Sequence, residues 1–193
     1  MKKYNGLPVF EVEFDDLMSV FNNVSIVTEP AIMENFIKLS KQDNLNIKMK
    51  IDEEKKIVSG PVLIPDQLIY RRDGYYEYYI KWSAKTIEQV AINFFQNHRN
   101  TEGNVEHQFS VNGITFYESY IINKERGLTP VEFSDLPDGT WMMTAKVNND
   151  DVWNAIKSGE LNGFSIDIAN VNFAEDKEID SLDELMEYIK NNK

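Results

Sequence analysis

The chain has 193 residues, of which 42% are hydrophobic and 27% charged, a balance typical of one globular domain that buries a core. Its 32 acidic and 20 basic residues give a net charge of −12, which opposes the phosphate backbone and disfavours nucleic-acid binding. The absence of cysteine excludes disulfides, thiolate metal sites and cysteine nucleophiles.

The first half of the chain predicts several strands and one helix. Alternating or β-branched residues indicate strands at 10–14, 24–28, 47–51, 56–64 and 76–82. Pro30 suits the first turn of a helix, and the apolar residues after it recur at helical spacing through Ser40. Gly60 and Pro61 interrupt the fourth strand, so we expect a bulge or an edge there.

The rest of the chain predicts three further helices. Ser83 is a plausible N-cap for a helix whose apolar stripe runs from Ile87 to Phe95. Acids in a first turn and Gly159 beyond the end predict a helix at about 150–158, and a capping-box spacing predicts a short C-terminal helix at about 181–191. More strands are expected at 105–111, 114–122, 140–147 and 164–171.

Strands and helices do not alternate regularly along the chain. This order favours an α+β fold, a mostly antiparallel β-barrel or sheet with peripheral helices, over a doubly wound sheet. No apolar run approaches the roughly 18 residues that span a bilayer. The first residues also lack the apolar core of a signal peptide, so we expect a soluble intracellular protein with no membrane partner.

One turn signal suggests a catalytic pair. Asn112-Gly113 between two β-prone runs favours a two-residue type I′ hairpin. In that register His107 lies opposite Glu118, with their Cβ atoms about 4.5–5.5 Å apart. A carboxylate beside an imidazole holds its tautomer and stabilises the imidazolium, although a surface pair on a hairpin would have the same spacing.

Ser165 is the candidate nucleophile. It follows Gly163-Phe164 at the start of a strand and would project opposite to its bulky neighbours. A serine needs an adjacent base, and the chain has only two histidines. His98 follows the predicted helix and is explained by a solvated helix end. Two histidines without cysteine or His-Glu-x-x-His spacing give no recognisable zinc site, and we expect neither a metal nor a cofactor.

Several stretches occur in a distinctive order and spacing: Val24–Ala31, Val58–Asp66, Val105–His107, Glu118–Ile121, Gly139–Trp141, Lys146–Val147 and Trp153–Ile166. Together they resemble the phage prohead (capsid maturation) serine proteases of the XkdF-like type. The resemblance implies a herpesvirus-assemblin-like protease fold in which His107 and Ser165 are catalytic. The resemblance covers the chain from about Val24 to Ile168, and the chain length favours a single protease-like domain over residues 1–193.

The third catalytic member departs from that family's pattern. Related prohead proteases carry an acid just before a Val-Ser-Leu-Val-like strand that follows the serine. Here the similar Val24-Ser25-Ile26-Val27 comes early and is preceded by Asn23, so the order looks rearranged and the acid is missing. We prefer Glu118 because the hairpin register places it independently of the family, with Asn23 and Asp167 as alternatives.

The resemblance implies a serine endopeptidase that cleaves scaffold protein and major capsid protein extensions inside the immature phage capsid, in the host cytoplasm. His107 would deprotonate Ser165 while Glu118 steadies the imidazolium. The scaffold and capsid proteins are therefore the expected partners, and homo-oligomerisation stays open. The alternative is a catalytically inactive virion or assembly protein that retains the protease fold.

Overall fold

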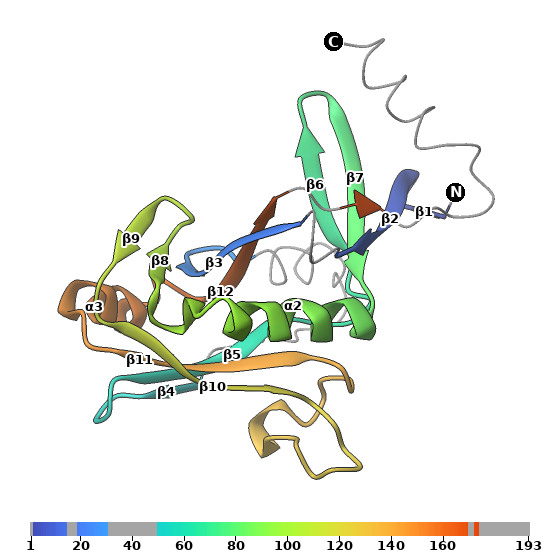
Figure 1. Cartoon of the computed structure of the whole chain (residues 1–193). Helices are drawn as coiled ribbons and strands as arrows, with labels where there is room; N and C mark the ends of the chain where they lie inside the picture. The colour runs from blue at the N-terminus through green and yellow to red at the C-terminus, as the bar shows by residue number, and fades with distance from the viewer. Residues whose placement is uncertain (1, 15–18, 31–49, 170–171, 174–193) are drawn as a thin grey trace.

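The computed structural model describes residues 2–14, 19–30, 50–169 and 172–173. Its strands form three sheets, seen with the helices in Figure 1. The first sheet has the order β1 (Lys3–Tyr4), β2 (Leu7–Glu13), β7 (Tyr76–Trp82) and β6 (Ile69–Asp73), and β13 (Asn172–Phe173) pairs with β2. In this sheet β2 and β7 run parallel, whereas the other pairs are antiparallel.

The second and third sheets have four strands each. The second is antiparallel, in the order β10 (Ile114–Ile121), β11 (Trp141–Val147), β5 (Ile57–Leu63) and β4 (Lys50–Asp52). The third has the order β12 (Gly163–Ala169), β3 (Val20–Val27), β8 (Gly103–Val105) and β9 (Phe109–Val111), with β3 and β8 parallel.

Two α-helices lie in the described residues, and both confirm the sequence prediction. Helix α2 (Ala84–Gln96) begins where the Thr86 N–H donates to Ser83 Oγ at 3.2 Å. Helix α3 (Asp150–Ser158) ends at Gly159, whose φ of 77° is readily adopted by glycine. Short 3₁₀ turns occupy Arg99–Thr101 and Val131–Phe133.

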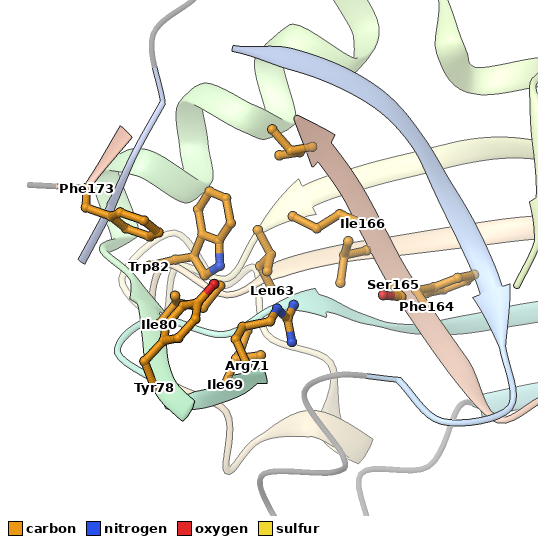
Figure 2. A pocket seen from close by; sticks show the side chains of 12 residues that line it. Leu63, Ile69, Arg71, Tyr78, Ile80, Trp82, Phe164, Ser165, Ile166 and Phe173 are labelled. Atoms are coloured by element: carbon orange, nitrogen blue, oxygen red, sulfur yellow. The ribbon is translucent and has the colours of Figure 1, made fainter. Parts of the chain in front are cut away.

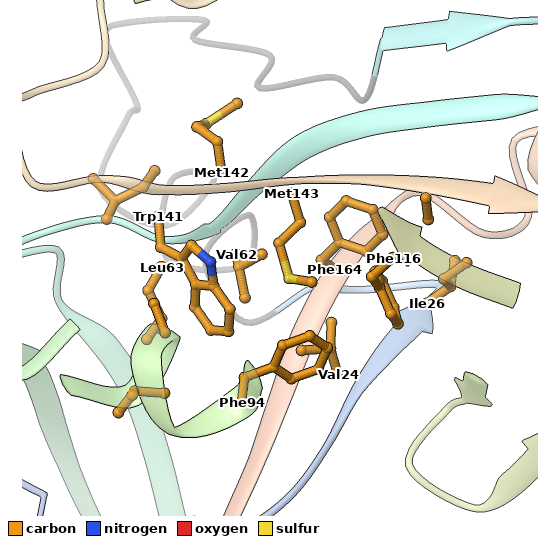
Figure 3. Packing of buried hydrophobic residues seen from close by; sticks show 14 of the residues in the cluster. Val24, Ile26, Val62, Leu63, Phe94, Phe116, Trp141, Met142, Met143 and Phe164 are labelled. Atoms are coloured by element: carbon orange, nitrogen blue, oxygen red, sulfur yellow. The ribbon is translucent and has the colours of Figure 1, made fainter. Parts of the chain in front are cut away.

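Helix α2 fixes how two of the sheets sit together. It runs between the sheet containing β5, β10 and β11 and the sheet containing β3 and β12 (Figure 1). Its Phe94 ring packs edge-on against Phe116 and Trp141, at centroid distances of 5.7 and 5.9 Å. Phe116 in turn packs against Phe164 of β12 at 5.9 Å, and these aromatic side chains are almost fully buried (Figure 3). Burial of each such side chain stabilises the fold by roughly 1.5–3 kcal/mol, so this cluster firmly anchors β12.

The described strands do not close into a barrel, so within them the fold is a sheet-rich α+β arrangement. The expected irregularity at Gly60 and Pro61 is confirmed. The register between β11 and β5 shifts where Met142 pairs with Pro61. The described pairing of β4 with β5 ends at Ser59. Pro61, which has no N–H to donate, therefore lies beyond the end of β4.

The predicted hairpin at Asn112-Gly113 is wrong. Strand β9 pairs with β8, and β10 pairs with β11, so the chain changes sheets at this turn. The Gly113 carbonyl accepts from the Asn148 N–H at 2.6 Å, which directs the chain toward β11. Ile114 and Phe116 then enter the core, with exposed fractions of 1% and 0%.

Four remaining predictions fall wholly or partly outside the described residues. The C-terminal helix at about 181–191 lies entirely there, as does the helix through Ser40 after Pro30. The expected strand at 47–51 is described only from Lys50 onward, and the one at 164–171 only as far as Ala169. In the part of the chain that is described, no helix is both long and apolar enough to cross a membrane.

Candidate active site

A row of polar side chains crosses one face of the sheet β12-β3-β8-β9. Ser165 of β12 pairs with Ser25 of β3, Ser25 with Asn104 of β8, and Asn104 with Ser110 of β9. Residues directly opposite on neighbouring strands share a face, with Cβ atoms about 4.5–5.5 Å apart in an antiparallel pair. Because Phe164 is anchored in the core, its neighbour Ser165 projects to this polar face.

His107 lies on the tight turn that joins β8 to β9. Glu106 and His107 both have a φ of 56°, and the Gln108 N–H donates to the Val105 carbonyl at 3.2 Å, as in a type I′ turn. The Glu106 backbone N–H donates to the carbonyl of Ile26 at 3.2 Å, and its carboxylate accepts from the Thr28 N–H. These two bonds fasten the turn to the end of β3 and place His107 beside the polar row.

Ser25 is the residue that contacts the histidine. Its Oγ lies 3.0 Å from His107 Nδ1, 2.9 Å from Asn104 Oδ1 and 2.7 Å from Asn23 Oδ1, and the residue is 0% exposed. A serine hydroxyl donates one hydrogen bond and accepts two. The side-chain oxygen of one asparagine can accept the serine proton. The other asparagine, through its amide nitrogen, and His107, through Nδ1–H, can then donate to the serine oxygen. In the tautomer in which Nδ1–H donates to Ser25, Nε2 carries the free lone pair.

The surroundings of His107 favour its neutral form. Burial of the ring against packed atoms lowers its pKa below 6.5, although the residue as a whole stays exposed. The negative charges of Asp167 and Glu106 oppose this shift, and the Arg71 guanidinium adds to it. Asp167 pairs with Asn23 across β12 and β3, and its carboxylate accepts from Asn22 Nδ2 at 3.0 Å. A neutral imidazole beside a serine can act as a general base.

A pocket of about 170 Å³ adjoins Ser165 (Figure 2). Strands of all three sheets contribute to it, and most of its wall is aliphatic or aromatic. The lining residues are Val62, Leu63, Ile69, Arg71, Tyr78, Ile80, Trp82, Phe164, Ser165, Ile166, Ile168 and Phe173.

The structure brings two of the three predicted catalytic residues to one site. His107 and Ser165 both lie at the polar row, but in the described residues the side chain hydrogen-bonded to the His107 ring is that of Ser25 and not that of Ser165. Glu118 pairs instead with Thr144, in the sheet of β10 and β11, and the charges that shift the pKa of His107 do not include it. The pairing on which Glu118 was chosen is therefore wrong.

The two alternatives for the third member lie within the site, since Asn23 contacts Ser25 and Asp167 is paired with Asn23. Ser25 and Asn104 belong to the site but are not predicted from the sequence. The one signal for Ser25 is its place between Val24 and Ile26, in a strand that is part of the family resemblance. His98 is exposed just beyond α2, as expected for a helix end.

In the residues that the structure describes, no three histidine, aspartate or glutamate side chains are close enough to hold a metal ion. The groups that meet at this site are hydroxyls, amides, one imidazole and one nearby carboxylate. This set is suited to transferring a proton from a hydroxyl to an imidazole.

Comparison with known proteins agrees with the sequence resemblance. Residues 44–175, well over half of the chain, match the family described as "Putative phage serine protease XkdF". The chain is also 27% identical over 154 residues to "Uncharacterized protein YqbD" of Bacillus subtilis (strain 168). That similarity covers 75% of this chain and 42% of the relative, so the chain spans less than half of the relative's length. No solved structure matches significantly, and the herpesvirus-protease-like fold stays a prediction.

Proposed function

The chain belongs to the XkdF family, whose description names a phage serine protease, and on this premise we propose that it is a serine endopeptidase with Ser165 as nucleophile and His107 as base. The observation that carries the proposal is the turn Glu106-His107, which holds the imidazole beside the polar row containing Ser165. The family match includes both residues.

In the proposed reaction, His107 Nε2 takes the proton of Ser165 while the serine oxygen bonds to a peptide carbonyl carbon. The imidazolium then gives this proton to the leaving amine, and water releases the acyl group by the same steps in reverse. Ser25 holds Nδ1 in the donor state, in place of a carboxylate. The negative charge of Asp167 favours the imidazolium, and backbone N–H groups would bind the oxyanion.

We propose phage scaffold and major capsid proteins as the substrates, cleaved inside the immature capsid in the host cytoplasm. The support is the family resemblance and the family's description as a phage protease. These proteins are then also the expected partners.

The test is co-expression with the scaffold and capsid proteins of the same phage, with fragments identified by mass spectrometry. Ser165→Ala should abolish the fragments, and His107→Gln should reduce them at least about a hundredfold because the general base is lost. Ser110→Ala, an exposed serine in the same row, is the matched control and should cleave normally. Undiminished cleavage by folded Ser165→Ala would remove Ser165 from the mechanism.

One observation favours a second function, that of an inactive assembly protein with a protease fold. His107 Nδ1 contacts a hydroxyl where proteases of the triad type have a carboxylate. A fluorophosphonate probe separates the two functions because it reacts with an activated serine. Labelling of Ser165 supports the enzyme; its absence in correctly assembled capsids that also lack cleavage products supports the assembly role.

A further inference from the structure

Strand β12, which carries Ser165, has one backbone edge without a strand partner in the described part of the chain. It stands at the end of the order β12-β3-β8-β9. The pocket lies along β12 and is completed by residues of β5, β6, β7 and β13 (Figure 2). An unpaired strand edge offers N–H and C=O groups to an extended peptide, and an adjoining pocket can then receive one of its side chains.

Part of the pocket wall is formed by side chains that are also packed in the core. Leu63, Ile69 and Trp82 are 2%, 3% and 4% exposed, so packing with the rest of the core fixes their positions. A volume of about 170 Å³ is sufficient for an aromatic ring, since an apolar protein cavity of about 150 Å³ can bind benzene. The pocket therefore has room for a large side chain, and ten of its twelve lining residues are aliphatic or aromatic.

Arg71 places one positively charged side chain in the pocket wall. It is the one lysine or arginine among the lining residues, and Figure 2 shows its guanidinium on the same side of β12 as Ser165. Its charge also acts on His107, so it lies near the reacting groups as well as the pocket. A lysine or arginine side chain entering here would leave water and approach a like charge.

We propose that the substrate binds as an extended strand along the free edge of β12 and inserts a leucine, isoleucine, methionine or phenylalanine side chain into this pocket, beside the bond to be cut. The proposal rests on the proposed function, because it makes the pocket the specificity site of the same serine. It names the substrate class as extended peptides with a large apolar residue next to the cleavage point.

Binding is tested without catalysis in folded Ser165→Ala, with isoleucine δ1-methyl groups labelled for NMR. N-acetyl-phenylalaninamide is the probe, and N-acetyl-lysinamide is its matched control. The phenylalanine probe should shift the methyl signals of Ile69, Ile80, Ile166 and Ile168, which line the pocket, and leave the core methyl of Ile87 unchanged. Equal shifts with both probes, or no shift at the pocket methyls, would overturn the proposal.

Specificity is tested by digesting a peptide library with the full chain. Large apolar residues should exceed alanine at one position beside the cut by at least about tenfold in kcat/KM. Ile168→Trp, which fills the pocket from the partly exposed end of β12, should remove that preference. Cleavage that depends on Ser165 but shows no apolar preference would refute the pocket and leave the peptidase standing. Probe binding without any cleavage would refute the peptidase and leave the pocket.

Discussion

Ser25→Ala should damage both the reaction and the fold, because this hydroxyl is the group that contacts His107 Nδ1. A hydrogen bond to a group that becomes charged is worth about 1.5–3 kcal/mol. At about 1.36 kcal/mol for each factor of ten in rate, its loss predicts a decrease of about 10- to 150-fold in kcat/KM. Because Asn104 is 7% exposed and also loses a partner, we expect a further cost of about 1–3 kcal/mol in the free energy of unfolding.

The assay is kcat/KM on a peptide spanning a mapped cleavage site, together with urea unfolding of each variant. Nitrogen-15 NMR of the imidazole reports the tautomer directly: the wild type should carry its proton on Nδ1, and Ser25→Ala should move the population toward Nε2–H. Glu118→Gln and Ser110→Ala are controls, since neither residue contacts the ring in the described structure.

A folded Ser25→Ala protein with wild-type kcat/KM and an unchanged tautomer would refute the orienting role. Another outcome would assign the nucleophile to a different serine. If a fluorophosphonate probe labels Ser165→Ala but not Ser25→Ala, the nucleophile is Ser25. The complete burial of Ser25 leads us to expect the opposite labelling.

Two further predictions concern the titration of His107. Asp167→Asn removes the negative charge that raises the pKa of His107 most, so this pKa should fall further. The acid limb of the kcat/KM profile should then move to lower pH. NMR titration of His107 checks this, with His98 as internal reference. Because the folded pKa of His107 lies below its unfolded value of about 6.5, its contribution to stability should be complete above pH 6.5 and decline as the pH falls toward the folded pKa. Urea unfolding at pH 7.5 and 5.5 should therefore show a smaller loss of stability for His107→Gln than for the wild type, and equal losses would contradict the assigned shift.

The elements that local sequence determines were predicted well. Helix α2 follows from the Ser83 cap and an apolar stripe, and α3 ends at Gly159 because glycine readily adopts the left-handed region. The residues that carry these signals lie within a few positions of the helix ends that they determine. The same is true of the alternation that put Ser165 and Phe164 on opposite faces of β12.

The catalytic pairing was not predictable in the same way. Asn112-Gly113 has the preferred composition for a hairpin, but burial of Phe116 against residues brought together by long-range pairing overrides it. The actual tight turn uses Glu106 and His107, which carry no turn signal because non-glycine residues rarely adopt positive φ. Ser25 and Asn104 are 79 positions apart, and only the parallel pairing of β3 with β8 makes them neighbours.

The turn at Glu106 and His107 also makes the position of the histidine depend on a few local hydrogen bonds. A left-handed conformation costs roughly 1–2 kcal/mol for each non-glycine residue, and here two adjacent residues adopt it. The hydrogen bonds that join Glu106 to Ile26 and Thr28, at the end of β3, hold the turn in this conformation. Local opening of these two bonds would release His107 from the polar row, and the buried aromatic side chains of Phe94 and Phe116 take no part in them. The position of the imidazole thus depends on the end of one strand, a contact that can open without unfolding the protein.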